Sequence, residues 1–330
     1  MLFTKSSGIN DSVYGKSQEP IVMFLEEEEQ AYLKTTQVSN IFTQRKTDKF
    51  AEKFSYLTAK GDFENVGEGG AYPRTSQQVG YEKVLTPLEW KNSFEVTQTM
   101  IEDAEIFSVT SMAKDFMMSY ARTREKYAAA LFNGGNSTST TFGGFTVDTT
   151  SADAVALFST AHPSKTGAIS NQTNYFNAAF TYDNLMAIEE YMQKYTDDDG
   201  NLLNIQPDTI IIPNNARIKK LVYDAVLTSS GRPDTANNST NVNADRWNII
   251  VWNQLVNPTG ATGDIWFLMD SKKSAVDGLF WLDRIPLSVK SWVDENTDNN
   301  IFGGRARFVM GANNWRCVAG CFAGIGGTTL

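Results

Sequence analysis

The longest regular pattern in the chain lies between Ile101 and about Phe132, where apolar residues recur at helical spacing. No Gly or Pro interrupts this segment, and the pair Gly134-Gly135 follows it. At about 1.5 Å per residue such a helix is about 45 Å long, which predicts a structural spine. The apolar stripe consists of Met112, Phe116, Tyr120, Tyr127 and Leu131.

Residues 50–92, before this helix, contain two strand-like pieces, around Phe54–Leu57 and Tyr81–Leu88. The Gly-rich tract 61–70 separates them, so the pattern predicts a long β-hairpin with a Gly-rich tip. The hairpin has too few apolar residues for a core of its own, and an isolated two-stranded ribbon is marginally stable. We therefore expect it to need a surface to pack against, which a partner subunit would supply. A further strand is expected at about 92–100.

The rest of the chain alternates helix and strand patterns, which predicts a mixed α/β body. Residues 133–175 are rich in Ser, Thr, Gly and Asn and predict loops. One helix is expected over Leu185–Tyr195, ended by the acidic turn 197–200, and another after Pro213. The last strands are expected to return and pair with the strand before the spine. Strands are predicted at Thr209–Ile212, Ile249–Leu255, Asp264–Met269, Leu279–Leu282, Ile285–Val293, Arg305–Met310 and Arg316–Phe322.

Two segments carry no such pattern. Residues 1–50 predict an extended arm with a short amphipathic helix at about Ile21–Leu33, and the run Glu26–Glu29 is typical of a solvated face. Residues Ser229–Ala244 predict a surface loop. Long irregular loops in compact domains usually have a function, so this loop is a candidate contact region.

Composition is that of an ordered globular protein, with 330 residues of which 41% are hydrophobic. The formal net charge of −9 argues against a dedicated nucleic-acid binder. Cys317 and Cys321 are too few for a disulfide framework, so we expect a reducing compartment such as cytoplasm, with both residues buried on one element. We expect neither a signal peptide nor a membrane span, because no apolar window is long enough.

Candidate chemistry is sparse because the chain has a single histidine, His162. No Gly-x-Ser-x-Gly elbow accompanies it, and we interpret it as a turn residue whose ring bonds the backbone. Gly15-Lys16-Ser17 lacks the first glycine of a phosphate-binding loop. The run Asp197–Gly200 lacks the flanking carboxylates of a calcium loop, so a turn explains it better. The sequence therefore predicts no catalytic residue, no cofactor and no metal site.

Several short motifs occur in an order that resembles one family. Leu157–Pro163 (LFSTAHP) is followed by Asp197–Ile205 (DDDGNLLNI) and by Pro207–Pro213 (PDTIIIP). Phe94–Thr97 leads into the spine helix, and Gly304–Trp315 looks like the family's C-terminal strands. With the order of arm, hairpin, strand, spine and α/β body, these motifs resemble the major capsid proteins of tailed bacteriophages (Hong Kong 97-type fold). They are most similar to the Mu-like prophage head-subunit group.

The resemblance implies an α+β phage major-capsid fold in four parts. These are an N-terminal arm (1–49), an extended β-hairpin named the E-loop (50–92), a peripheral domain with the spine helix (93–133 and 284–312) and a mixed α/β axial domain (134–283 and 313–330). It also implies a structural, non-enzymatic protein that self-assembles as hexamers and pentamers. The resulting icosahedral shell would enclose double-stranded DNA in the virion after assembly in the host bacterial cytoplasm.

Two segments are the candidate interfaces under this resemblance, and the expected partners lie around them. A separate scaffolding protein, a portal and a decoration protein are expected beside the copies of the chain itself, with non-specific contact to packaged DNA. The E-loop tip is expected to contact a neighbouring subunit and comprises Gly61, Asp62, Phe63, Gly67, Gly69, Gly70 and Arg74. The loop expected at the capsomer axis comprises Gly231, Arg232, Asp234, Asn237 and Asn238.

Two alternatives stay open on the sequence. An encapsulin-like compartment has the same fold but holds protein cargo. A carboxylate-based hydrolase would need two acids at glycosidase separation, and nothing in the sequence brings such a pair together.

Overall fold

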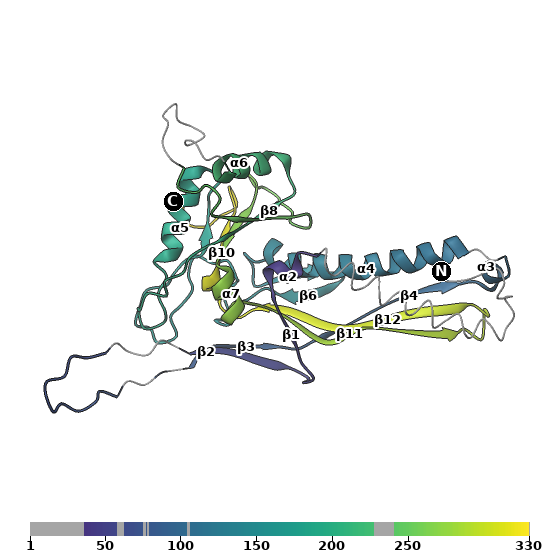
Figure 1. Ribbon diagram of the computed structural model, residues 1–330, viewed down its shortest axis with the longest axis horizontal. Coiled ribbons are helices and arrows are strands. Elements are labelled where there is room, and N and C mark those ends of the chain that lie inside the picture. The colour runs from purple at the N-terminus through teal and green to yellow at the C-terminus, as the bar shows by residue number, and fades with distance from the viewer. Residues whose placement is uncertain are drawn as a thin grey trace.

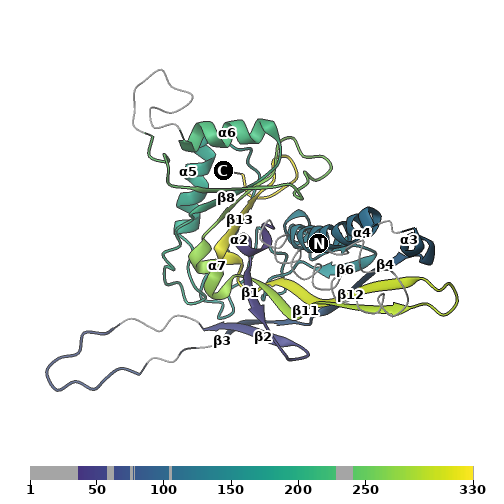
Figure 2. The same cartoon turned by 45° about the vertical axis from the view of Figure 1, so that its right-hand side comes forward.

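Two β-sheets organise the computed structural model, which describes residues 36–57, 63–74, 77, 79–103, 106–227 and 241–329. One sheet is long and runs beneath a long helix, and the other lies in a separate α/β part (Figure 1). A hairpin leaves the junction of the two parts and extends away from both (Figures 1 and 2). In the described residues, no helix is both long and apolar enough to cross a membrane.

The long sheet has four strands in the order β1-β11-β12-β4. β12 pairs antiparallel with β11 and with β4, so the C-terminal strands return to the strand before the spine, as predicted. β11 is one continuous strand where two short ones were predicted. Register shifts around Ile285 let the ladder accommodate Pro286, which has no N–H to donate. The strands are β1 (Thr43–Lys46), β4 (Leu88–Val96), β11 (Leu279–Val293) and β12 (Asn300–Ala312).

The spine is helix α4 (Ile106–Asn133), which lies along one face of this sheet (Figure 1). It ends at the glycine pair, as predicted. Its start differs, because a separate short helix, α3 (Gln98–Glu102), precedes it. The Thr97 hydroxyl accepts a hydrogen bond from the Met100 N–H, and this cap ends the strand that was expected to continue to residue 100. The Arg124 guanidinium bonds both carboxylate oxygens of Asp283 on β11, which ties the helix to the sheet.

The second sheet has five strands in the order β7-β13-β10-β8-β9, with α5 and α6 beside it. Its central strands are buried on both faces, which explains their unbroken apolar sequence. Helix α7 (Ser271–Asp277) was not predicted because it has no apolar stripe; the Asp270 carboxylate caps it by accepting the Lys273 N–H. The remaining bounds here are β7 (Tyr175–Phe176), α5 (Tyr182–Gln193), β8 (Thr209–Pro213), α6 (Ala216–Leu227), β9 (Asn248–Trp252), β10 (Trp266–Met269) and β13 (Val318–Cys321).

A continuous apolar core joins the two sheets. Phe132 at the end of the spine packs edge-on against Trp252 and Phe267 of the second sheet, and Phe42 links it to Trp281 of the first. The smaller elements around this junction are α2 (Val38–Ile41), η1 (Trp315–Cys317) and the short hairpin β5 (Ser139–Phe142) and β6 (Phe145–Asp148). That hairpin lies in a region predicted only as loops, since its strands are too short to show a period.

Candidate assembly interface

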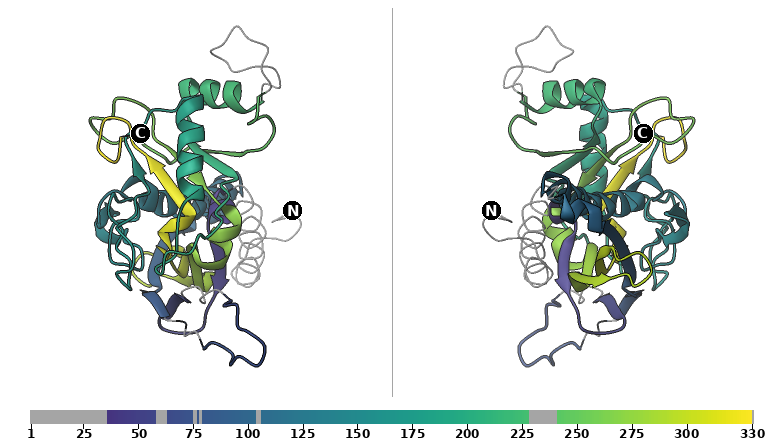
Figure 3. Two further views of the ribbon diagram at one scale, coloured as in Figure 1. Left: turned by 90° about the vertical axis from the view of Figure 1, so that its left-hand side faces the viewer. Right: turned by 90° about the vertical axis from the view of Figure 1, so that its right-hand side faces the viewer.

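The projecting hairpin consists of β2 (Glu52–Leu57) and β3 (Val79–Leu85), paired antiparallel as predicted. Its tip, residues 63–74, extends beyond the body (Figure 3). All twelve residues of the tip are exposed, and the Tyr72 side chain is 95% exposed. Phe63 is fully exposed. Large aromatic side chains that are exposed to solvent on a projecting hairpin are typical of a surface that a partner covers.

Only some of the residues predicted for the tip lie in the described part of the chain. Phe63, Gly67, Gly69, Gly70 and Arg74 lie in this exposed tip, and Gly69 adopts a φ of +80°, which a glycine tolerates. Gly61 and Asp62 lie outside the described residues. The same holds for the expected axis-loop residues Gly231, Arg232, Asp234, Asn237 and Asn238, and for the predicted helix at Ile21–Leu33.

The base of the hairpin packs on its own subunit, so the expectation that the whole hairpin needs a partner subunit is wrong for the base. Phe54 stacks on Phe280 of β11 with ring centroids 4.4 Å apart. Leu85 lies in the same buried cluster, together with Leu282 and Val309. Phe54 and Leu85 face the long sheet and pack on its two central strands, β11 and β12, whereas Val84, next to Leu85, points the other way and is 57% exposed because side chains alternate along a strand.

Charged side chains fasten the base at two further points. The Lys83 ammonium donates to the Asp148 carboxylate and to the Thr150 hydroxyl, each at 2.6 Å. Burial would raise the pKa of Asp148, but the bonds from Lys83 and Thr150 lower it overall. The Lys165 ammonium donates to the Gly80 carbonyl at 2.7 Å. The Lys83 contacts join β3 to the end of β6 and to Thr150 just after it, and the Lys165 contact joins β3 to a later loop.

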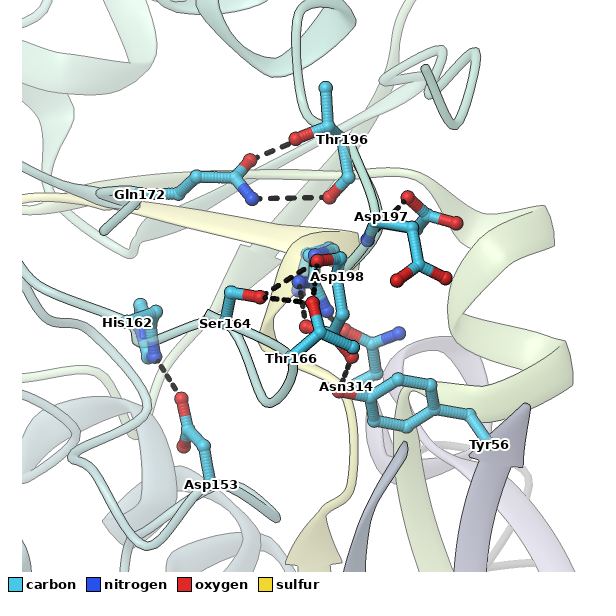
Figure 4. Close-up of polar contacts among 12 residues, drawn as sticks. Tyr56, Asp153, His162, Ser164, Thr166, Gln172, Thr196, Asp197, Asp198 and Asn314 are labelled. Carbon is cyan, nitrogen blue, oxygen red and sulfur yellow. Dashed lines mark hydrogen bonds and ion pairs between the residues drawn. The ribbon is translucent and has the colours of Figure 1, made fainter. Parts of the chain in front are cut away.

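A third anchor is the triad Tyr56, Asp198 and Arg316, of which Figure 4 labels Tyr56 and Asp198. The Tyr56 hydroxyl donates to the Asp198 carboxylate at 3.0 Å, and the Arg316 guanidinium bonds its other oxygen at 3.0 Å. The Asp198 and Arg316 side chains are 0% and 2% exposed. Burial raises the pKa of Tyr56 to about 12, with Arg316 lowering it and Asp198 raising it. Removing one member of such a buried pair typically costs about 3–5 kcal/mol.

The acidic run that holds Asp198 is a turn, as predicted. The Asp197 carboxylate accepts the N–H groups of Asp199 and Asn201, and Gly200 adopts a φ of +96°. The inward role of Asp198 was not predicted. Nothing in the local pattern distinguishes it from its neighbours, since its partners come from residues 56 and 316.

The interpretation of His162 as a turn residue bonded to backbone is wrong. Its ring is buried and bonds two side chains. Nδ1 lies 2.7 Å from the Asp153 carboxylate (Figure 4), and Nε2 lies 3.0 Å from the Asn174 amide oxygen. The ring also stacks on Trp315 at 4.1 Å. Both ring nitrogens are thus used in packing the loops against η1, an arrangement that depends on residues distant in sequence.

The two cysteines are fully buried, as predicted, but lie on two elements, Cys317 on η1 and Cys321 on β13. Burial raises the pKa of both thiols, and the Asp277 carboxylate adds to the shift for Cys317. Low thiolate content and lack of access make both residues poor nucleophiles.

An elongated α+β body that holds an exposed aromatic tip on a firmly anchored arm has the architecture of a subunit made for assembly. The chain belongs to the phage capsid protein family, whose model, described as "Phage capsid protein", matches residues 80–320. It is a structural major capsid protein that forms an icosahedral shell and is a component of the virion. The finer assignment to the Mu-like group stays a prediction.

Solved capsids have the same fold at low sequence identity. The capsid of an empty GTA particle is 12% identical, with a TM-score of 0.55 and coverage of 88% of this chain and 90% of that chain. A Mycobacterium phage Adephagia chain is 15% identical, with a TM-score of 0.53 and coverage of 89% and 91%. A Microbacterium phage Oxtober96 chain is 12% identical, with a TM-score of 0.52 and coverage of 87% and 91%. No curated protein matches the chain.

Proposed function

We propose that the chain assembles as hexamers and pentamers, and that the hairpin of each subunit lies over a neighbour in the shell that encloses the double-stranded DNA. The observation that carries this proposal is the contrast within the hairpin. Its base is fastened by Phe54, Tyr56 and Lys83, whereas its tip exposes Phe63 and Tyr72. The fixed base sets where the hairpin leaves its own subunit, and the exposed aromatic residues of the tip give a partner apolar area to bury.

The four-part division proposed for the chain follows the two sheets only approximately. The arm (1–49), the E-loop (50–92), the peripheral domain (93–133 and 284–312) and the axial domain (134–283 and 313–330) remain our assignment. β4 begins at Leu88, inside the proposed E-loop, and β11 runs through the proposed boundary at 283/284. The peripheral and axial parts therefore share a strand and are expected to move together.

A separate scaffolding protein, a portal and a decoration protein are the further partners we propose, with assembly in the bacterial cytoplasm and non-specific contact with packaged DNA. Efficient formation of correctly sized shells from the purified chain alone would contradict the need for a scaffold. We propose no enzymatic activity, because the ring of the single histidine is bonded on both nitrogens and both thiols are buried.

The direct test replaces Phe63 and Tyr72 by serine in the full chain. We expect soluble, folded subunits that no longer form shells, because the aromatic contact surface is lost while the anchored base is intact. Light scattering distinguishes free subunits from megadalton particles, and electron microscopy shows the particles. Val256→Ser is the matched control. Val256 is also well exposed (65%), but it lies in the loop after β9, a strand of the second sheet.

Normal shells from the double serine variant would contradict the proposed role of the tip. Particles from the unmodified chain that contain protein cargo and no DNA would favour the encapsulin-like alternative. A chain that stays monomeric under all assembly conditions would contradict the shell itself.

A further inference from the structure

His162 lies within the loops 149–174, between β6 and β7, where these loops pack against η1. The His162 and Asp153 side chains are 0% and 2% exposed, and the His162 ring stacks on Trp315 with an angle of 10° between the ring planes (Figure 4 shows His162 with Asp153). Each ring nitrogen lies within hydrogen-bond distance of a side-chain oxygen, one of Asp153 and one of Asn174. The number of hydrogens on the ring therefore follows from whether these two oxygens donate or accept.

The neighbour of Nε2, the Asn174 amide oxygen, can only accept a hydrogen bond. The Asn174 amide nitrogen donates to the Leu157 carbonyl at 2.8 Å and to the Val318 carbonyl at 3.1 Å. The amide oxygen accepts the Ser159 N–H at 2.9 Å. The reversed amide would place its NH2 group against the Ser159 N–H and its oxygen against two carbonyls, so the network fixes which atom is the oxygen. Nε2 must therefore carry a hydrogen and donate it.

The neighbour of Nδ1 is a carboxylate, which also accepts. The Asp153 Oδ1 atom accepts the Ser151 hydroxyl and the Val155 N–H, and Oδ2 faces Nδ1. Burial would raise the pKa of Asp153, but the bonds from His162 and Ser151 lower it overall, so the carboxyl is ionised at neutral pH. An ionised carboxylate has no hydrogen to donate. Nδ1 must therefore donate as well.

We propose that the His162 ring carries hydrogens on both nitrogens in the folded subunit, and that this buried positive charge holds the loops 149–174 together and against η1. A neutral imidazole has only one N–H. Loss of the second hydrogen would leave either Asp153 or Asn174 facing a bare nitrogen, and a buried acceptor without a donor is costly. The contact is thus proton-dependent, and it belongs to the interior of one subunit, apart from the surfaces proposed for assembly.

The other ionisable groups around the ring do not replace Asp153 as its partner. They are Arg316, Asp198, Tyr81, Lys165 and Tyr195. Arg316 pairs with Asp198, and the Lys165 ammonium bonds the Gly80 carbonyl. The Tyr195 hydroxyl donates to the Thr173 carbonyl, and burial raises the pKa of both tyrosines, so both stay neutral. Among the described residues, Asp153 is the carboxylate that pairs with His162.

The first test measures the hydrogens on the ring. His162 is the single histidine of the chain, so 15N-histidine labelling of the full-length, unassembled subunit gives one pair of ring nitrogen signals in an NMR spectrum. At about pH 7.5 we expect both nitrogens to have the similar shifts of a doubly protonated ring. The same sample unfolded in urea is the control and should show the averaged shifts of a mostly neutral ring. One protonated and one bare nitrogen in the folded subunit would overturn the proposal.

The second test measures the same proton through stability. A folded state that holds one more proton than the unfolded state becomes less stable as pH rises, and its unfolding constant increases about tenfold per pH unit. We expect this increase between about pH 7 and pH 8 in urea unfolding of the unassembled subunit, and we expect His162→Gln to lose it. The range ends below about pH 8.5, where the buried thiols of Cys317 and Cys321 would add a change of the same sign.

Lys220→Gln, at an exposed position on α6, is the matched control and should keep the dependence of the parent chain. Equal slopes in the parent chain and in His162→Gln would overturn the proposal, because folding would then take up no proton at His162. If His162→Gln does not fold, the ring nitrogen shifts of the parent chain decide between the two outcomes.

Discussion

Trp315 separates two buried acid–base pairs. Its ring stacks on His162, which bonds Asp153, and lies 4.8 Å from the Arg316 guanidinium, which bonds Asp198. Four ionisable side chains thus meet around one indole inside the subunit. Losing one member of either pair leaves a buried polar or charged group without its partner, which is costly, so the packing of the loops against η1 depends on both pairs.

The pH dependence can be predicted for Asp153. Burial would raise its pKa, but the bonds from His162 and Ser151 lower it overall. A carboxyl whose pKa is lower in the folded state adds stability above its unfolded pKa, near 3.9, and loses that stability as the pH falls through the folded pKa. We expect the Tm of the unassembled subunit to fall below about pH 4 and Asp153→Asn to flatten that fall.

Thermal unfolding followed by circular dichroism between pH 2 and pH 7 measures both effects. Glu68→Gln in the exposed tip serves as the control and should leave the profile unchanged. An Asp153→Asn profile parallel to that of the parent chain would show that this carboxylate does not contribute.

At the scale of elements, the hairpin has two parts that differ in packing, an anchored base and an exposed tip. β2 and β3 are fixed at the base by the stack of Phe54 on Phe280 and by the bond from Tyr56 to Asp198. Alternation and the Gly-rich tract predicted the hairpin, but they could not predict where its base would be held. The anchoring residues lie more than 140 positions away from Tyr56, and the sequence carries no local trace of them.

Tyr56→Phe is expected to loosen the base without unfolding the subunit. The variant loses one hydrogen bond, worth about 0.5–1.5 kcal/mol, while Asp198 keeps its pairing with Arg316. Faster hydrogen exchange at the amides of β2 and β3, with the second sheet unchanged, is the expected result. Tyr72→Phe at the tip is the matched control, and equal protection in the two variants would contradict the role of Tyr56 as an anchor.

For the whole molecule, a hairpin tip that contacts a neighbour predicts how defective and intact subunits behave together. A chain with Phe63→Ser and Tyr72→Ser keeps the other surfaces of the subunit. Mixed with the parent chain before assembly, it is expected to lower shell yield by more than its share of the mixture, because a shell needs many contacts at once. Light scattering measures the yield, and a fall only in proportion to the added variant would contradict this expectation.

The sequence by itself determined the elements with strong local signatures: the spine helix, its end at Gly134-Gly135, the hairpin and the buried strand Thr209–Pro213. Periodicity and turn residues act over a few positions, so they can be read without the fold. Only the tertiary structure decided the environment of His162 and the anchoring of Tyr56. Each of these brings together residues far apart in the chain, and their burial, pairing and exposure exist only once the two sheets have packed.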